Sequence, residues 1–308
     1  MNYQDFVSTK MSQFQSAGLS VCSDRLNKIL FPFQKSIVSW AIRQGRAAIF
    51  AECGLGKTLM QLEWGRWMGE GGNVLIFAPL TVADQTICES RYLGFGDLGG
   101  GVNYCQKGVD LRPWPWINIT NYERLDYFID AQLQAVILDE SSILKAQDGK
   151  TRTRLINAYQ RVPYRLCCTA TPAPNDITEI ANHAEFLGIK TRQEMLAAWF
   201  VHDSDGWRLK GHATREFYRW MASWAVYVRR PSDLGFSDEG YDLPPLRIHP
   251  EVVHVEMVPE GQLFATELGG IGGHSAVRRH TLDARVERAA KLASEGQWIV
   301  WCGLNDES

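Results

Sequence analysis

Short apolar runs alternate with longer stretches of mixed polarity through the first 170 residues of the chain. Five of these runs have the length of a buried strand, and they cover residues 47–50, 73–79, 116–120, 135–140 and 164–171. Strands of a parallel sheet are buried on both faces, so they read as continuous apolar runs. The pattern therefore predicts an α/β fold in which helices cover both faces of a parallel sheet.

After about residue 191 the hydrophobic pattern becomes helical. In TREFYRWMASWAVYV, the aromatic residues Phe217, Trp220, Trp224 and Tyr227 recur at the spacing of one helix face. We expect this face to pack against the protein, and a surface on which bases stack is the less favoured alternative. The residues from 229 to 250 are rich in Pro and Gly and predict a linker.

Beyond the linker the sequence predicts four further elements. These are a strand at 252–258, a Gly-rich loop at 269–274, a helix at about 276–294 and a strand at 297–302. The chain as a whole is expected to have four parts. They are an N-terminal extension (1–30), a first α/β domain (31–190), a helical segment with the linker (191–245) and the start of a second α/β domain (246–308).

The composition is that of a soluble globular protein. Of the 308 residues, 45% are hydrophobic and 22% are charged. The longest apolar runs, such as residues 74–80, are too short to cross a bilayer. The N-terminus, MNYQDFVSTK, lacks the apolar segment of a signal peptide, so we expect a cytoplasmic location and no membrane partner.

The overall charge gives no sign of a nucleic-acid partner, because the net charge is −3 at pH 7. Residues 143–165 are a local exception, with six cations against a single acid, Asp148. The cations are Lys145, Lys150, Arg152, Arg154, Arg161 and Arg165. A contact with an anionic partner and an ordinary solvated face are equally favoured interpretations of this stretch.

The cysteines do not form a metal-binding or disulfide pattern. They stand at positions 22, 53, 88, 105, 167, 168 and 302, without a C-x-x-C pair. The spacing therefore favours neither zinc nor a disulfide framework, and it predicts buried free thiols.

Residues 51–58, AECGLGKT, follow an apolar run and have the layout of a phosphate-binding loop, with Ala51 where the strict pattern has Gly. Gly54 and Gly56 allow the backbone to curl around an anion, Lys57 can reach the outer phosphates, and the Thr58 hydroxyl can ligate Mg²⁺. A Gly-rich turn that binds nothing is the structural alternative. The residues expected to contact a nucleotide here are Cys53, Gly54, Leu55, Gly56, Lys57, Thr58 and Leu59.

The run at 135–140, AVILDE, ends in two acids. Asp139 stands where a carboxylate can hold Mg²⁺ through water, and Glu140 stands where a base can orient an attacking water. Acid pairs often cap strands or helices, but a GKT about 80 residues earlier makes hydrolysis of a nucleoside triphosphate the favoured interpretation. Ligands of parallel sheets bind beyond the carboxyl ends of the strands, so the loop, the acid pair and the TAT of residues 169–171 are expected to share one site.

The order of these motifs resembles that of the superfamily-two helicases, and within them the Swi/Snf-like branch of DNA translocases, which overlaps the DEAD/DEAH-box annotation. In that branch Ala is usual at the first position of the phosphate loop. The motifs that carry the resemblance are LFPFQKSIVSWAI (30–42), AECGLGKT (51–58), APLTVADQT (78–86, similar to motif Ia), TNYE (120–123, motif Ib), DESS (139–142) and TATPAPN (169–175, motif III). The segment YVRRPSDLGF…DLPPL resembles the entry to the second motor domain. The likeness is to compact, phage- or prophage-encoded members, for which the host cytoplasm is the expected location.

The resemblance implies a RecA-like P-loop ATPase domain, followed by a helical segment and the start of a second RecA-like domain. It implies ATP and Mg²⁺ as cofactors and movement along nucleic acid without sequence specificity, with double-stranded DNA as the expected track. It also implies roles for individual residues outside the phosphate loop and the acid pair: adenine recognition by Gln34, contacts with the nucleic-acid backbone by Thr81, Thr120 and Asn121, and coupling of hydrolysis to movement by Thr169 and Thr171.

Two departures from the family pattern qualify these expectations. DESS is neither DEAD nor DEAH, which disfavours an RNA-unwinding role. The family's later motifs and arginine fingers would follow residue 308, whereas Arg229 and Arg230 match the linker. We therefore expect the 308-residue chain to bind ATP and hydrolyse it weakly. Two other classes stay open: an ATP-gated nucleic-acid-binding or scaffold protein without turnover, and a P-loop ATPase unrelated to nucleic acid.

Overall fold

The computed structural model describes residues 16–94, 99–145, 149–204, 206–241, 245–255 and 281–302. The chain divides into two compact units, Met1–Asp242 and Leu243–Ser308. The first unit contains every strand of the described residues. None of the helices in the described part of the chain is long and apolar enough to cross a membrane.

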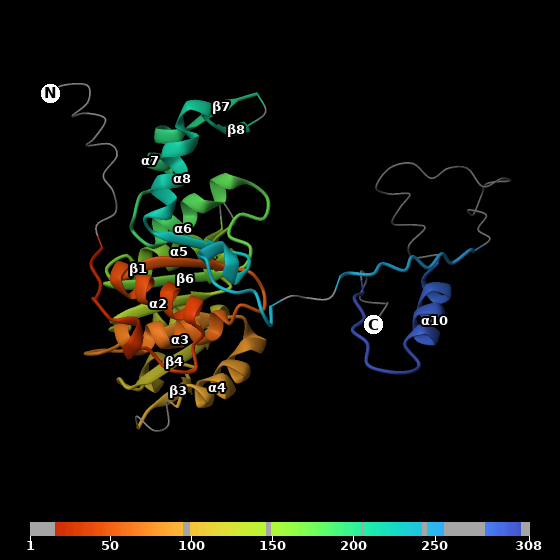
Figure 1. Ribbon diagram of the computed structural model, residues 1–308, viewed down its shortest axis with the longest axis horizontal. Helices are drawn as coiled ribbons and strands as arrows, with labels where there is room; N and C mark the ends of the chain where they lie inside the picture. The colour runs from red at the N-terminus through yellow and green to blue at the C-terminus, as the bar shows by residue number, and fades with distance from the viewer. Residues whose placement is uncertain are drawn as a thin grey trace. The chain divides into compact units, whose positions relative to one another are not determined.

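The first unit is built on a seven-stranded sheet with the order β3-β4-β2-β5-β6-β1-β9, in which all neighbouring strands are parallel (Figure 1). The predicted parallel sheet is therefore confirmed. The strands are β1 (Arg46–Ala51), β2 (Val74–Ala78), β3 (Gly101–Tyr104), β4 (Trp116–Asn121), β5 (Ala135–Asp139), β6 (Tyr164–Thr169) and β9 (Ala225–Val228).

Helices cover both faces of this sheet. One face carries α2 (Pro32–Gln44), α3 (Lys57–Met68) and α4 (Ala83–Tyr92). The other face carries α5 (Lys150–Tyr159), α6 (Ile180–Phe186), α7 (Arg192–Trp199) and α8 (Thr214–Ala222). Successive residues of a strand point to opposite faces, so Ile49 of β1 joins the first core and Phe50 joins the second.

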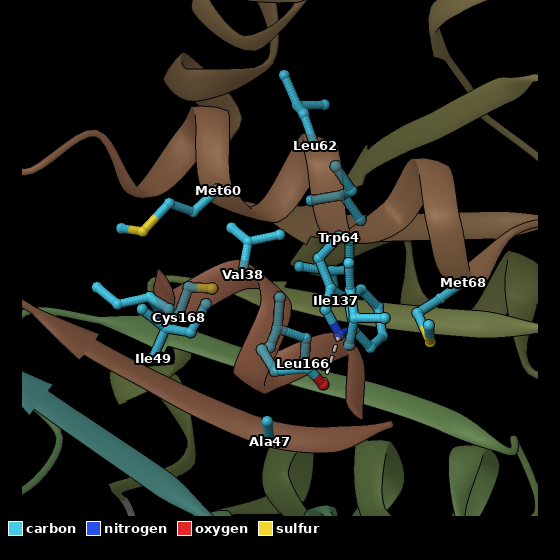
Figure 2. Close-up of a cluster of buried hydrophobic side chains, with 14 of the residues drawn as sticks. Val38, Ala47, Ile49, Met60, Leu62, Trp64, Met68, Ile137, Leu166 and Cys168 are labelled. Carbon is cyan, nitrogen blue, oxygen red and sulfur yellow. Dashed lines mark hydrogen bonds between the residues drawn. The ribbon is translucent and has the colours of Figure 1, made fainter. Parts of the chain in front are cut away.

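The core under α2 and α3 explains how the phosphate-loop helix is held in place. Figure 2 shows Trp64 of α3 among Val38, Ile137 and Leu166, and the dashed line marks its indole N–H donating to the carbonyl of Ala41 at 3.2 Å. The Trp64 side chain is fully buried, and its hydrogen bond satisfies the one polar atom that burial removes from water. This bond holds α3 against α2 above the sheet.

The segment predicted as helical after residue 191 differs from the expectation. Helix α8 ends at Ala222, and the next residues form β9, which pairs with β1 at the edge of the sheet. Phe217, Trp220 and Trp224 are buried as predicted, but Tyr227 lies in the strand and is 48% exposed. The four residues of helix-like spacing thus run from α8 through the turn after it into β9. A two-stranded antiparallel sheet, β7 (Phe200–Asp203) and β8 (Gly206–Leu209), was also not predicted.

The second unit contains the helix α10 (Leu282–Leu292), which overlaps the helix predicted at 276–294. Strands were predicted on either side of it, but the described residues of those stretches, 252–255 and 297–302, are not in a sheet. Residues 256–280, which include the rest of the first strand and the Gly-rich loop, lie outside the described residues, as do residues 1–15 of the N-terminal extension.

Candidate functional site

Three motifs that are far apart in the sequence meet at the carboxyl edge of the sheet. The strands β5, β6 and β1 are consecutive in the sheet, and they end at Asp139, Thr169 and Ala51. The register sets Phe50 opposite Thr169 and Asp139 opposite Cys168. The phosphate loop, the acid pair and the TAT segment therefore occupy one edge, where parallel sheets bind their ligands.

The loop between β1 and α3 has a backbone that glycine permits. Gly54 and Gly56 have φ values of 85° and 76°, in the left-handed region. A Cβ at Gly56 would lie 2.4 Å from Nε2 of Gln34, whereas a Cβ at Gly54 would meet no atom within 4 Å. Gly56 directly precedes the first residue of α3, so the N-terminus of that helix, with its unpaired N–H groups, opens onto the loop.

Lys57, the first residue of α3, turns back along the loop. Its ammonium group donates to the carbonyl of Ala51 at 2.9 Å and to that of Glu52 at 3.4 Å. Thr58 and Leu59 are half-buried beside it, Leu55 is buried, and Cys53 is exposed. A flexible cation that rests on carbonyls of the loop is available to a phosphate bound over that loop.

Gln34 lies beneath the loop and is 2% exposed. Its side-chain oxygen accepts from the N–H of Phe31 at 2.9 Å, which caps the start of α2, and its amide donates to the carbonyl of Leu55 at 2.9 Å. The side chain thus ties the start of α2 to the phosphate loop. The sequence contained no signal for this support, and recognition of adenine by Gln34 stays a prediction.

Asp139 is a buried carboxylate at the end of β5. Burial raises the pKa of this carboxyl to about 6, the nearby charge of Glu140 adds to the rise, and the Gln61 amide and the Lys57 ammonium oppose it. A divalent cation beside a buried carboxylate would lower its raised pKa and favour its charged form. Because the loop N–H groups, Lys57 and the Thr58 hydroxyl lie at the same edge, the residues fit a magnesium-bound triphosphate.

Glu140 is the one residue other than glycine with a positive φ in the described part of the chain, at 48°. Its carboxylate accepts from the hydroxyl of Thr169 at 3.2 Å, and that hydroxyl in turn accepts from the N–H of Thr171 at 3.1 Å. The TAT segment therefore holds the acid directly. A strained backbone at a polar sheet edge is typical of a functional residue.

A cavity of about 850 Å³ adjoins this edge. Glu52 of the phosphate loop, Thr171 of the TAT segment and Arg229 beyond β9 contribute to its wall. No pattern in the sequence indicated this cavity, because Tyr227 and Arg229 line it only as a result of β9 joining the sheet.

The residues proposed to touch nucleic acid have different surroundings. Thr81 is exposed in the short 3₁₀ helix η2 (Leu80–Val82), directly after β2. Thr120 is 1% exposed, and its hydroxyl donates to the carbonyl of Cys105 at 2.8 Å. Asn121 is 6% exposed and donates to the hydroxyl of Tyr104 at 3.4 Å. Thr81 is therefore accessible at the surface, whereas the Thr120 hydroxyl is already hydrogen-bonded inside the fold.

The six cations between residues 143 and 165 do not form one surface. Arg165 lies on β6, is 3% exposed and donates to the carbonyl of Phe186 at 2.5 Å, so the prediction of surface contact is wrong for this residue. Arg154 pairs with Asp126. Arg161 precedes the start of β6 and so lies at the amino ends of the strands, opposite the phosphate loop. Lys145 and Lys150 follow β5 and are exposed at the carboxyl ends, where the phosphate loop lies.

The cysteines agree only in part with the prediction of buried thiols. Cys105, Cys167 and Cys168 are buried, and burial raises the pKa of each thiol, to about 12 for Cys105. Cys22, Cys53, Cys88 and Cys302 are exposed, which corrects the prediction for these four. Within the described residues, no group of three or more His, Cys, Asp or Glu side chains could hold a metal ion.

Two curated proteins are similar to this chain in sequence. The "SWI/SNF-related matrix-associated actin-dependent regulator of chromatin subfamily A-like protein 1" of Xenopus laevis is 29% identical over 178 residues, which are 55% of this chain and 18% of that protein. Its counterpart in Xenopus tropicalis is 30% identical over 170 residues, which are 53% of this chain and 18% of that protein. The chain thus spans less than a fifth of these relatives. No protein-family model matches it.

Solved structures with the same fold come from Sulfolobus solfataricus. The "SWI2/SNF2 ATPase core in complex with dsDNA" has a TM-score of 0.56 and 17% identity, and it covers 68% of this chain and 46% of its own. The "SWI2/SNF2 ATPase core domain" has a TM-score of 0.54 and 15% identity, with 71% and 48% covered. The sequence relatives therefore support the Swi/Snf-like, superfamily-two helicase interpretation that the motifs suggested, and the solved structures share the parallel-sheet fold.

Proposed function

We propose that this chain is the nucleotide-binding part of an ATP-dependent nucleic-acid motor. The motor hydrolyses ATP to ADP and phosphate and moves along double-stranded DNA without reading its sequence. The observation that carries this proposal is the meeting of the phosphate loop, Asp139 with Glu140, and Thr169 at one edge of the sheet.

The residues at this edge divide the chemistry between them. The loop N–H groups and the start of α3 bind the phosphates, and Lys57 adds a positive charge to the outermost ones. Thr58 and Asp139 would hold Mg²⁺, which neutralises charge on the phosphates when it is bound. Glu140 accepts the proton of the attacking water, because it is the carboxylate next to the metal ligand and Thr169 holds it in place.

Double-stranded DNA as the track is supported by exposed residues of this chain and by one structural neighbour. Thr81 presents an exposed hydroxyl directly after β2, and Lys145 and Lys150 are exposed on the segment that follows β5. Side chains of this kind bind the phosphates of the backbone and do not contact the bases. One structural neighbour is described as a complex with double-stranded DNA, which favours the duplex as the track here.

The test is single-turnover ATP hydrolysis with the protein in excess, so that slow turnover is also detected. The assay compares protein alone with duplex DNA, single-stranded DNA and RNA at equal nucleotide concentration, and it includes two duplexes of unrelated sequence. We expect the largest stimulation from duplex DNA, and the same stimulation from both sequences. Hydrolysis that no nucleic acid stimulates would contradict a motor function, and stimulation by RNA alone would contradict the proposed track.

A further inference from the structure

Three fully buried polar side chains surround the turn that follows Glu140. Ser141 begins the 3₁₀ segment η6 (Ser141–Lys145), and Asn182 and His183 lie on α6, about 40 residues later in the chain. All three are 0% exposed. Burial of polar groups is unfavourable unless they are hydrogen-bonded, so their contacts indicate what they support.

His183 holds the first residue of the turn. Its Nε2 lies 3.2 Å from the hydroxyl oxygen of Ser141, the residue directly after Glu140. Its ring meets the ring of Phe50 edge to face, with 5.2 Å between the centroids. Phe50 is the residue before Ala51, so a single imidazole contacts both the acid turn and the strand that leads into the phosphate loop.

Asn182 holds the other end of the same segment. Its amide donates to the carbonyls of Leu144 at 2.7 Å and Lys145 at 3.4 Å. Its side-chain oxygen accepts from the guanidinium of Arg152 on α5 at 3.3 Å, which fixes the orientation of the amide. Carbonyls at the end of a helical segment lack partners within it, and Asn182 provides the missing donor.

The turn requires such support because of the backbone at Glu140. A positive φ in a residue with a side chain is unfavourable unless the surroundings enforce it. Within the turn, the N–H of Ile143 donates to the carbonyl of Glu140 at 3.2 Å, which alone is a weak constraint. Contacts at both ends of η6 therefore fix the backbone of the turn, and they act together with the Thr169 hydroxyl that bonds the Glu140 carboxylate.

We propose that Asn182 and His183 are positioning residues that hold the turn after β5 and thereby aim Glu140 at the attacking water. The proposal rests on the role of Glu140 proposed above. Neither residue touches the phosphates, so loss of either side chain lowers the rate of hydrolysis and leaves nucleotide affinity unchanged.

The experiment uses the variants Asn182→Ala and His183→Phe, with Ser141→Ala as a milder variant. Asn118→Ala is the matched control, because Asn118 is equally buried on β4 and its amide also donates to two backbone carbonyls, those of Val74 and Arg112. Three quantities are measured for each variant: the Kd for magnesium–ATP, the single-turnover hydrolysis rate, and amide hydrogen exchange across residues 141–145.

We expect both positioning variants to keep the Kd within about twofold, to hydrolyse roughly 10- to 100-fold more slowly, as misplaced catalytic groups do, and to exchange faster at 141–145. The control Asn118→Ala should lower the stability of the fold but leave the hydrolysis rate and the exchange at 141–145 unchanged. Turnover within twofold of wild type, or exchange at 141–145 no faster than in the control, would overturn the proposal. If wild type itself does not hydrolyse ATP, the proposed function fails, and the exchange data still decide whether these residues hold the turn.

Discussion

Gln34 illustrates how a residue with one expected role acquires a second from its position. Both ends of its amide are bonded inside the protein, to Phe31 and to Leu55. The second bond reaches the middle of the phosphate loop, so the side chain affects loop geometry for any bound nucleotide. Its expected part in adenine recognition is a separate effect and can be measured separately.

We predict that Gln34→Ala weakens the binding of both ATP and GTP, because the carbonyl of Leu55 loses its partner and the loop is held less firmly. An additional narrowing of the ATP-over-GTP preference is expected from lost adenine recognition. Competition binding with the two nucleotides measures both effects. Unchanged affinity for both would contradict the supporting role, and an unchanged ratio would limit Gln34 to that role.

Buried His183 makes the protein sensitive to acid. Burial lowers the pKa of its imidazole to about 4, whereas the unfolded chain titrates near 6.5. The folded state therefore binds fewer protons than the unfolded state between these values. This contribution to stability is complete above about pH 6.5 and is lost as the pH falls towards 4.

The variant His183→Phe should lack this dependence. Over the window from pH 6.5 to 4, the free energy of unfolding of the wild type should fall by up to about 3 kcal/mol more than that of the variant. Urea unfolding at several pH values measures the difference. Parallel pH profiles for the two proteins would show that the imidazole is not held neutral in the fold.

At the scale of residues, the sequence predicted which side chains share the site but not which hydrogen bonds hold them. The sequence predicted that Lys57, Asp139 and Glu140 would share a site, because each follows an apolar strand and parallel strands end at one edge. The links from Thr169 to Glu140 and from Asn182 to η6 depend on which strands and helices become neighbours. That order is set by long-range packing, which no local pattern records.

Among the elements, central strands were predictable and edge strands were not. The strands β1, β2, β4, β5 and β6 are buried on both faces and read as apolar runs. The edge strand β3 has four residues, of which only Val102 is buried. The other edge strand, β9, lies inside an aromatic pattern that continues the spacing of α8. A half-covered edge lacks the continuous run that identified the others.

The basic segment yields a prediction at the same scale, because some of its cations lie at the carboxyl ends of the strands and others at the amino ends. Reversing Lys145 and Lys150 to Glu should weaken binding to duplex DNA and reduce the slope of log Kd against log salt by roughly one to two. The matched control, Arg161→Glu, changes an exposed cation of the same stretch at the far edge and should leave the slope unchanged. Equal effects of the two changes, or none, would contradict a contact near the phosphate loop.

Considered as a whole molecule, the chain combines a seven-stranded parallel sheet in its first unit with a second, smaller unit. The sheet extends past residue 190 to β9, so the residues that follow the TAT segment belong to the same compact unit. We propose that residues 246–308 begin a second RecA-like domain, because the RRPSDLGF and DLPPL segments resemble the entry to that domain. The site described here lies entirely within the first unit.

The central claim is that Lys57 binds the triphosphate while Glu140 acts on the water. Its most direct test compares Lys57→Ala with Glu140→Gln, measuring the Kd for magnesium–ATP and the single-turnover rate with duplex DNA present. We predict that Lys57→Ala weakens binding at least tenfold, because a charge-assisted contact with the phosphates is lost. Glu140→Gln should bind as wild type does and hydrolyse at background rate. Equal loss of binding in both variants, or turnover by Glu140→Gln at the wild-type rate, would contradict the account.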